Sequence, residues 1–331
     1  MRIFSGIQPT GRKHLGNYIG AILGYLDGQE RGDPAIYCIV DLHATSVAYD
    51  PRALPVYVHD TTAMLMAAGL DPERCILFRQ SDVAEHSELC WLLSSVTAYG
   101  DLQRMTQFKD KAEQEQQLVR TSLFLYPVLQ AADILLYGAD EVPVGEDQRQ
   151  HIELAREIAR RFNSSYGEVF VEPEAVVPKV GARIMDLQDP TKKMSTTGGT
   201  EAGLIYIDDE ADAIVKKVKR AQTDSGSEVV RGPDKAGITN LIDIHAVARG
   251  VSPDEVEREF AGQGYGAFKQ AVGEATADML APVRERYLEL RADEAALEET
   301  LRRGADRARE IAAPLMVEVH ELMGLGVRRL S

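Results

Sequence analysis

Apolar and polar positions are spaced in two different ways along the first hundred residues. Three short segments are predicted to be strands: residues 2–5, and the buried apolar segments 35–40 and 75–78. Stretches with apolar residues at helical spacing follow these segments: from residue 14, from 51 to 69, and near 85–98. Strand, helix, strand, helix, strand is the order of an α/β domain with a parallel sheet, so we expect this fold class at the start of the chain.

The pattern changes near residue 101 and becomes mainly helical. Helices are predicted at 101–117, 122–137 and 146–162, with a short extended piece at 142–145. Residues 163–204 contain clusters of glycine, proline and threonine and are predicted to be loops. From residue 208 onward the pattern indicates helices only. We therefore expect a helical second half attached to the α/β start.

Length and composition narrow the class of protein. A chain of 331 residues has room for two domains, or for one domain with a large insertion. It has no apolar run near the ~18 residues of a membrane span and begins without an apolar leader, so we expect a cytoplasmic protein that has no membrane contact. Its three cysteines form no CxxC pair, which argues against a cysteine zinc site, and we expect no metal held by the protein itself.

The net charge of −15 argues against a protein held on nucleic acid by bulk charge. It leaves room for a local basic patch. The densest basic cluster is Lys216–Arg220, which is the candidate contact for a polyanion, with plain solvation as the alternative.

A glycine-rich loop joins the first predicted strand to the first predicted helix at residues 6–17. A helix start behind such a loop offers free N–H groups and a positive dipole end to an anion. Gln8, His14 and Asn17 would add side-chain donors, and Gly16 would let a ligand approach the helix backbone. A simple turn before a capped helix is the alternative interpretation.

A second loop, 189–199, is basic and rich in hydroxyl groups. Lysine and hydroxyl donors on a flexible loop suit a phosphate chain that is gripped and then released, although an ordinary solvated loop has the same composition. Lys192 and Lys193 are neighbours in this loop, and we expect their side chains to point in different directions on an extended backbone.

Three acidic side chains stand near the predicted extended piece at 142–145. Asp133 lies among apolar residues, where a carboxylate needs a donor, either from the protein or from a ligand N–H. Glu146 and Asp147 begin a predicted helix and would cap it in any protein. Contact of Asp147 and Gln148 with a ligand is the other interpretation.

Two motifs in this order resemble the signatures of class I aminoacyl-tRNA synthetases. His14-Leu15-Gly16-Asn17 resembles their HIGH motif, and Lys193-Met194-Ser195-Thr196-Thr197 resembles their KMSKS loop. Further stretches resemble the bacterial tryptophanyl-tRNA synthetase family: residues 4–11, 105–109, 131–135, 142–148, 179–185, 262–266 and 323–326. The resemblance covers essentially the whole chain.

The resemblance implies a domain organisation. A Rossmann-type parallel sheet would occupy residues 1–102 and resume at 187–204 with the KMSKS-like loop. A helical connecting insertion, 103–186, would also form the interface of a homodimer. A C-terminal all-helical domain, 205–331, would bind the anticodon.

The implied reaction has two steps. ATP and L-tryptophan would form tryptophanyl-adenylate and pyrophosphate, with Mg²⁺ held mainly by the ATP phosphates, and the tryptophanyl group would then pass to tRNA(Trp). The attacking carboxylate is already an anion, so the protein mainly aligns its substrates and stabilises charge. This agrees with a sequence that has no evident Ser-His-Asp set.

The resemblance also implies site residues. Asp133 would accept the indole N–H, and Tyr126 and Gln148 would hold the ammonium group. The full tryptophan set is Phe4, Gly6, Val40, His43, Tyr126, Gln130, Asp133, Val142, Val144 and Gln148. The ATP set is Gln8, Pro9, Thr10, His14, Gly16, Asn17, Gly145, Glu146, Asp147, Ile184, Lys193, Met194 and Ser195. The groups assigned to catalysis are Gln8, His14, Asn17, Lys111, Lys193 and Ser195.

Four positions bear on substrate and activity. A tyrosyl-tRNA synthetase would carry a tyrosine in place of Phe4, and a substrate without a ring N–H would leave Asp133 unpaired at a cost of several kcal/mol. Gln130 replaces an expected methionine beside the indole, and Thr196 replaces the second KMSKS lysine. The alternatives are a synthetase paralogue with weakened catalysis and a regulatory or binding role, and an adenylyltransferase of the same superfamily that uses no tRNA.

Overall fold

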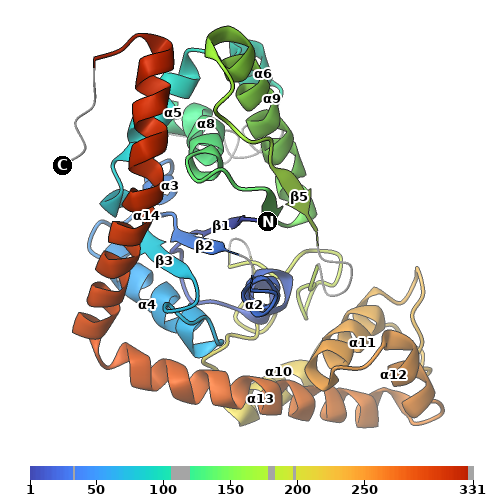
Figure 1. The fold of residues 1–331 in the computed structure, drawn as a ribbon. Coiled ribbons are helices and arrows are strands. Elements are labelled where there is room, and N and C mark those ends of the chain that lie inside the picture. Colours follow the sequence, from blue (N-terminus) through green and yellow to red (C-terminus); the bar gives the residue numbers. More distant parts are fainter. Residues whose placement is uncertain (33, 106–119, 178–182, 197–198, 327–331) are drawn as a thin grey trace.

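The structure is a computed structural model, and it describes residues 1–32, 34–105, 120–177, 183–196 and 199–326. Lys111, which was assigned to catalysis, lies outside the described residues. Two lobes are visible in Figure 1: a sheet with helices on both faces, and a helical lobe below it. None of the described helices combines the length and apolar character needed to cross a membrane.

Five parallel strands form one sheet in the order β3-β2-β1-β4-β5. The strands are β1 (Ile3–Ile7), β2 (Ala35–Ile39), β3 (Ile76–Arg79), β4 (Glu141–Pro143) and β5 (Glu174–Val176). β1 pairs with β2 along its whole length, from Ile3 opposite Ala35 to Ile7 opposite Ile39. The three predicted strands and the α/β fold class are confirmed, with boundaries displaced by one or two residues.

The prediction that the sheet resumes at 187–204 is wrong. Its fourth and fifth strands come from within 103–186, and the described part of 187–204 adds no strand to the sheet. β4 and β5 have only three residues each, and β5 is an edge strand with little burial, so neither shows the long apolar run of a central strand. The other predicted domain boundaries stay predictions.

Helices of the first half cover both faces of the sheet. The helix predicted from His14 begins at Leu15 and contains a π-helical turn, whereas the helix predicted from residue 51 begins only at Leu54 because 51–53 form a turn. The elements are α1 (Leu15–Asn17), η1 (Tyr18–Ile22), α2 (Leu23–Glu30), α3 (Asp41–Ala44), α4 (Leu54–Ala67), η2 (Gln80–Asp82), α5 (Glu85–Ser94), α6 (Tyr99–Gln103), α8 (Thr121–Leu135), η3 (Glu146–Gln148) and α9 (Arg149–Tyr166).

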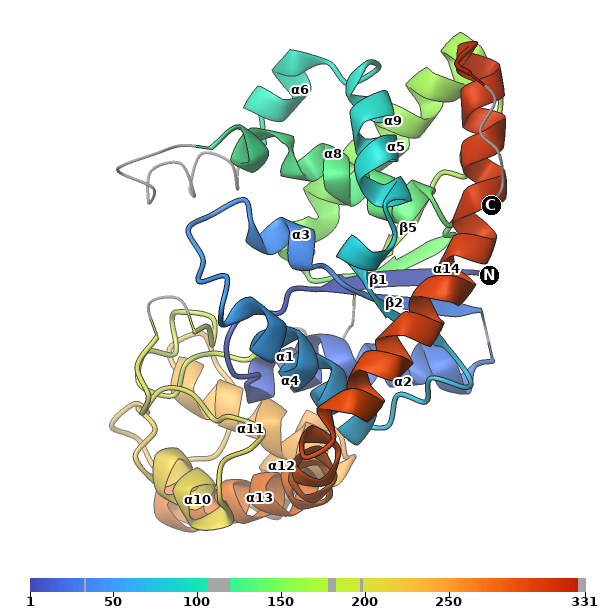
Figure 2. The same ribbon diagram turned by 90° about the vertical axis from the view of Figure 1, so that its left-hand side faces the viewer.

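The described residues after 208 form helices only, as predicted. These are α10 (Ala211–Lys219), α11 (Ala236–Arg249), α12 (Pro253–Glu259), α13 (Gly264–Arg291) and α14 (Glu294–Met323). Helices α10 to α13 make up the helical lobe, whereas α14 leaves it and packs along β3, α4 and α5. Figure 2 shows α14 running across the edge of the sheet from the helical lobe to the opposite end of the molecule.

Alternate side chains of each strand enter two apolar cores on opposite faces of the sheet, as the two-residue period of a strand requires. Ile3 and Tyr37 join the core that includes α2, α4 and the helical lobe. Phe4 and Ile36 join the core that includes α5, α8, α9 and α14. The sheet is therefore buried on both faces, and its chemically useful part is the edge where the strands end.

Gly304 on α14 is where this helix approaches the backbone of β3 most closely. A Cβ at Gly304 would overlap the carbonyl group of Leu77, so Gly304→Ala must push α14 away from the sheet. We expect a loss of about 1–3 kcal/mol in the free energy of unfolding, measured by urea denaturation. Gly24→Ala in α2 is the matched control, because a Cβ there meets no atom within 4 Å and should stabilise by about 0.5–1 kcal/mol. Equal midpoints for the two variants would contradict this packing.

Candidate active site

A cavity of about 540 Å³ lies at the carboxyl ends of β1, β2 and β4. The strand order reverses direction at β1, which has β2 on one side and β4 on the other. In open α/β sheets such a reversal leaves a crevice at the carboxyl edge, where ligands bind. The position of the cavity thus follows from the topology.

Most of the residues assigned from the sequence line this one cavity. They are Phe4, Gly6, Gln8, His14, Gly16, Asn17, Val40, His43, Tyr126, Gln130, Asp133, Val142, Val144, Gly145, Asp147, Gln148, Lys193, Met194 and Ser195. Among the assigned residues that are described, Pro9, Thr10, Glu146 and Ile184 do not line it. Glu146 pairs with Arg149 at 2.8 Å at the surface, and Ile184 is buried in the core behind the cavity.

The glycine-rich loop brings His14 and the helix start to the cavity wall. The backbone N–H of His14 donates to Asn17 Oδ1 at 3.1 Å, which closes the first helical turn. A Cβ at Gly16 would lie 3.0 Å from His14 Nδ1 and 3.4 Å from the Cβ of Met194, so only glycine leaves this contact relaxed. The turn and helix start of the alternative interpretation are present, and they also border the cavity.

Lys13 shapes the same loop, a role the sequence did not indicate. Its buried Nζ donates to the carbonyl oxygen of Gln8 at 2.7 Å and to that of Thr10 at 3.4 Å. Burial lowers the pKa of Lys13 to about 8, although the charge of Asp60 acts in the opposite direction. A lysine beside a glycine-rich loop looks like any surface lysine in the sequence, so no local signal distinguished it.

His14 is uncharged at neutral pH. Burial, followed by the positive charges of Lys13 and Lys193, lowers the pKa of its imidazole to about 4. The ring therefore offers one N–H donor and one acceptor beside the loop and adds no charge.

The basic loop is anchored by one buried side chain. Met194 is buried, and its backbone N–H donates to the carbonyl oxygen of Ile184 at 2.9 Å. This anchor turns Lys193 to the cavity, with Nζ 3.8 Å from Asp147 Oδ1, whereas Lys192 Nζ pairs with Asp189 at 2.8 Å outside the cavity. The prediction that the two lysines point in different directions is confirmed.

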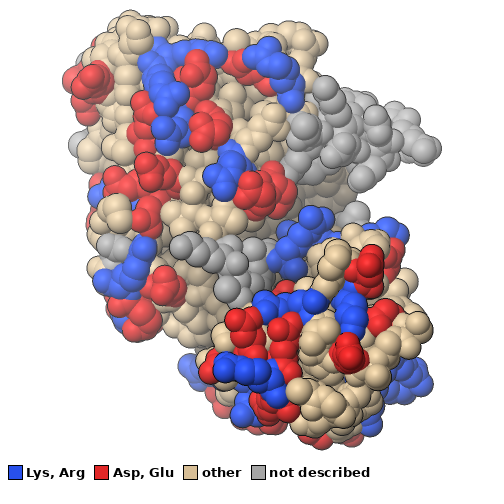
Figure 3. Space-filling model, turned by 90° about the vertical axis from the view of Figure 1, so that its right-hand side faces the viewer, with Lys and Arg blue, Asp and Glu red and all other residues tan. Residues whose placement is uncertain are grey.

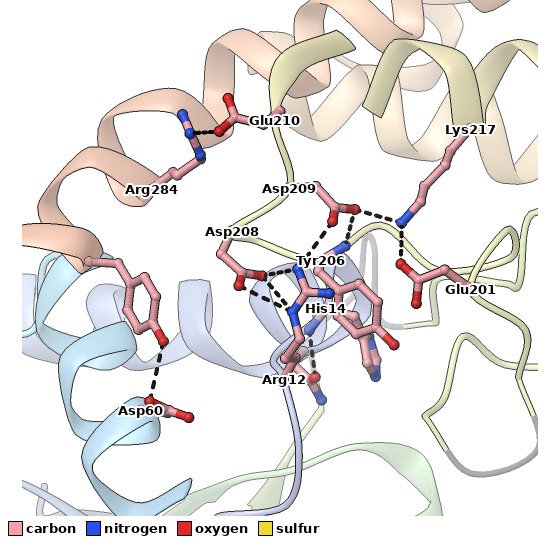
Figure 4. A network of polar contacts seen from close by, with 12 residues as sticks. Arg12, His14, Asp60, Glu201, Tyr206, Asp208, Asp209, Glu210, Lys217 and Arg284 are labelled. Carbon is pink, nitrogen blue, oxygen red and sulfur yellow. Dashed lines mark hydrogen bonds and ion pairs between the residues drawn. The ribbon is translucent and has the colours of Figure 1, made fainter. Parts of the chain in front are cut away.

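The segment after the basic loop is bound to the glycine-rich loop. Arg12 pairs with Asp208 at 2.8 Å and with Asp209 at 3.2 Å, and its guanidinium lies 4.0 Å from the ring centroid of Tyr206 (Figure 4). Lys217 of α10 reaches Asp209 at 2.7 Å. One lysine of the Lys216–Arg220 cluster is therefore turned inward, and the segment before α10 is joined to the glycine-rich loop through Asp208 and Asp209.

Helix α8 supplies the other end of the cavity. Tyr126, Gln130 and Asp133 follow one another at helical spacing and face apolar side chains from the strands. Tyr126 Oη lies 2.9 Å from Nε2 of His151, and Gln130 Nε2 lies 3.4 Å from Gln148 Oε1. This end combines an apolar wall with a few fixed polar groups, which is typical of a site for a small organic ligand.

Asp133 is 2% exposed and is ionised inside the protein. Its carboxylate oxygens lie 2.8 Å from His43 Nε2, 2.6 Å from Gln80 Nε2 and 2.7 Å from His86 Nδ1. Burial acts to raise the pKa of Asp133, but the hydrogen bonds from the two histidines outweigh it and hold the pKa at about 2. Asp133 is paired within the protein, as one interpretation expected, and it also lines the cavity. Its contact with a ligand N–H stays a prediction.

One crevice at the carboxyl edge of a Rossmann-type sheet has polar loops at one end and an apolar wall at the other, an arrangement that suits a nucleotide beside a small organic acid. The family described as tRNA synthetases class I (W and Y) matches residues 1–281. The chain belongs to this family.

Relatives with high coverage are similar to this chain over nearly its whole length. It is 48% identical over 324 residues to the tryptophan–tRNA ligase of Wolinella succinogenes, with 98% of each chain covered. It is 46% identical over 328 residues to tryptophan–tRNA ligase 1 of Streptomyces coelicolor, covering 98% of this chain and 97% of the relative.

Solved structures agree in fold. The tryptophanyl-tRNA synthetase of Mycoplasma pneumoniae has a TM-score of 0.90 at 35% identity, with 98% of each chain covered. The tryptophanyl-tRNA synthetase of Campylobacter jejuni, solved as a complex with ADP and tryptophan, has a TM-score of 0.82 at 34% identity, covering 98% of this chain and all 100% of that one.

The lowered pKa of His14 predicts how the stability of the protein depends on pH. Between pH 6.5 and about 4 the unfolded chain binds a proton at this site and the folded chain does not. Above pH 6.5 His14 is neutral in both states and does not affect folding. Below pH 6.5 the free energy of unfolding therefore decreases as the pH drops towards 4. In imidazole ¹H–¹⁵N spectra, the signal absent from His14→Asn should stay neutral down to about pH 5. A titration midpoint near 6.5 would contradict the burial of this ring.

Proposed function

We propose that this chain is a tryptophan–tRNA ligase that activates L-tryptophan with ATP and transfers it to tRNA(Trp). The observation that carries this proposal is one shared cavity, lined at one end by the buried Asp133 carboxylate and at the other by His14 and Lys193. An acceptor at the apolar end suits a ring N–H, and cationic and N–H donors at the other end suit phosphates.

The assigned roles divide along the cavity. Asp133 accepts the indole N–H, while Tyr126 and Gln148 hold the ammonium group. Phe4 forms part of the wall and stacks on Tyr137 with ring centroids 5.5 Å apart, and its lack of a hydroxyl supports tryptophan over tyrosine. Gln130 contacts Gln148 in this structure, so the polar substitution at this position is turned towards another polar side chain.

Adenylate formation is an in-line attack of the tryptophan carboxylate on the α-phosphorus of ATP, which enters as its magnesium complex with the ion on the phosphate oxygens. Pyrophosphate leaves with the negative charge. The chain contributes alignment of the two substrates and stabilisation of that charge by Lys193, Ser195 and the helix start at Leu15. Neutral His14 contributes hydrogen bonds without adding a second cation beside Lys193.

The second step requires tRNA on an acidic protein. On the face shown in Figure 3, basic side chains are interspersed with acidic ones over both lobes and do not form a single basic surface. The contacts we assign to tRNA are the exposed Lys216 and Lys219 on α10 and Arg220 at its C-terminal cap, with residues 205–331 as the anticodon-binding part. ATP and tRNA as the proposed substrates support a cytoplasmic location.

Tryptophan-dependent exchange of pyrophosphate into ATP, followed by charging of tRNA(Trp), tests the proposal directly. We expect both reactions with the full chain. Exchange without charging would favour an adenylyltransferase. Absence of both in a folded protein would favour a paralogue with a regulatory role.

Lys193 is the remaining lysine of the KMSKS-like loop that faces the cavity. Removing a preorganised donor at developing charge costs about 2.7–4 kcal/mol, so Lys193→Ala should lower the rate of adenylate formation by roughly 10²–10³. Tryptophan binding measured without ATP should be unchanged. Pre-steady-state adenylate formation measures the rate.

Lys192→Ala is the matched control, because Lys192 pairs with Asp189 outside the cavity. Its rate of adenylate formation should be within about threefold of the wild-type rate. Thr196 is exposed and does not line the cavity, so we expect Thr196→Lys to be neutral or mildly harmful. Wild-type rates in Lys193→Ala, or a tenfold gain in Thr196→Lys, would contradict these roles.

A homodimer is the proposed assembly, with an interface that extends from the predicted insertion onto α5 and α6. The only tryptophan of the chain, Trp91, is 76% exposed, and Tyr99 is 66% exposed. Large aromatic side chains left open to water are typical of an interaction surface. A dimer would also let one tRNA use basic residues of both subunits.

Sedimentation at micromolar concentration should give a dimer for the wild type and a monomer for Trp91→Glu, because a buried carboxylate at the interface is costly. The fluorescence of Trp91 should shift to the red on dilution into the monomer. Leu288→Glu, at a site 52% exposed on α13, is the control and should remain a dimer. A monomeric wild type, or a dimeric Trp91→Glu, would remove this surface from the assembly.

A further inference from the structure

Behind the cavity, a cluster of buried polar side chains surrounds Asp133. It takes Gln80 from η2, His86 from α5 and Tyr137 from the turn that follows α8, and all three are fully buried. None of the three lines the cavity, whereas Asp133 and His43 do. The sequence pattern gave these three residues no role.

The hydrogen bonds in this cluster have only one direction for a neutral imidazole. An ionised carboxylate is an acceptor only, so His86 Nδ1, 2.7 Å from Asp133 Oδ1, must carry the proton. His86 Nε2 is then an acceptor, and Tyr137 Oη donates to it at 2.8 Å. Burial, with the charges of Cys38 and Asp133 in addition, raises the pKa of Tyr137 well above its usual value, so the hydroxyl keeps its proton.

A count of acceptor positions shows what is left for a ligand. The two carboxylate oxygens offer about four lone-pair positions. Gln80 and His86 occupy both positions of Oδ1, and His43 occupies one position of Oδ2. The remaining acceptor position is on Oδ2, the oxygen that also accepts from His43, and both Asp133 and His43 line the cavity.

We infer that Gln80, His86 and Tyr137 are positioning residues that keep the Asp133 carboxylate ionised and turned so that its last acceptor position meets a ring N–H. This inference rests on the proposed function, since it assumes that the ring belongs to the amino-acid substrate. It assigns specificity to a chain of contacts that runs from Tyr137 through His86 to Asp133.

The cluster also lowers the loss of binding energy expected for a substrate that has no ring N–H. Asp133 already has three donors, so a ligand without a ring N–H loses one charge-assisted hydrogen bond and does not leave a bare charge. We therefore expect a preference of about 10- to 100-fold for the N–H, and not the larger factor that an unpaired carboxylate would give.

The test compares L-tryptophan with 3-benzothienyl-L-alanine, in which sulfur replaces the ring N–H. The readout is the ratio of the two kcat/KM values in ATP–pyrophosphate exchange. Tyr137→Phe removes the hydroxyl that holds Nε2 of the His86 ring, so the ring and the Asp133 carboxylate it supports are fixed less firmly and the ratio should fall about tenfold. The kcat/KM of the analogue should stay within about threefold.

Two variants separate positioning from structural support. Tyr37→Phe removes another buried tyrosine hydroxyl, which donates to the carbonyl oxygen of Tyr25 at 2.7 Å in the opposite core, and should leave the ratio unchanged. His86→Asn keeps an N–H close to the place of Nδ1 and should retain most of the ratio, whereas His86→Ala should lose it. If His86→Ala does not fold, the comparison of Tyr137→Phe with Tyr37→Phe decides.

The outcomes distinguish the inference from the proposed function. No exchange with tryptophan in the wild type would refute the proposed function. Exchange with tryptophan but no preference over the analogue would refute the role of the Asp133 carboxylate, and with it this inference. An intact ratio in Tyr137→Phe, or an equal loss for both substrates, would show that the cluster only supports the fold.

Discussion

A charge buried at the closed end of the cavity is the constraint on which the site depends. Removing a carboxylate from water costs several kcal/mol unless the fold supplies donors, and Asp133 receives them from α3, η2 and α5. These elements follow β2 and β3, so the strand order of the sheet determines which donors reach α8. The same topology opens the crevice at the carboxyl ends of the strands. Pocket and carboxylate are therefore products of one arrangement.

The two ends of the cavity carry opposite charges, a carboxylate at the apolar end and a lysine at the polar end. At the apolar end the Asp133 carboxylate is held by three hydrogen bonds and keeps one acceptor position for a further donor. At the polar end His14 is kept neutral by burial, and Lys193 carries the positive charge on a loop anchored by Met194. The network of Arg12, Tyr206 and Asp208 binds the segment after this loop to the glycine-rich loop, so both phosphate-facing segments share one support.

Sequence patterns predicted the elements and site residues whose structure is determined by neighbouring positions in the chain. The central strands were visible as apolar runs, and the cavity residues next to glycine-rich or basic motifs were found because their chemistry is concentrated in a few neighbouring positions. β5 was missed because an edge strand of three residues has no distinctive pattern. The return of α14 to the sheet depends on a close approach at Gly304, which no periodicity indicates.

The partners of Asp133 show most clearly what could not be predicted from the sequence. Gln80 and His86 are separated from Asp133 by 53 and 47 positions, and nothing beside them in the sequence marks them as its donors. Lys13 was equally hidden, because its function is a pair of contacts to backbone carbonyls. Pairings between distant segments are decided by packing, and they become visible only in three dimensions.

The central claim is that the buried carboxylate of Asp133 binds the ring N–H of tryptophan. The most direct measurement is the ¹H–¹⁵N spectrum of tryptophan labelled at the indole nitrogen and bound to the full chain. The account predicts an indole proton that is shifted downfield from the free amino acid and exchanges slowly with water. An indole proton with the shift and the fast exchange of free tryptophan, in a complex shown to be saturated, would contradict it.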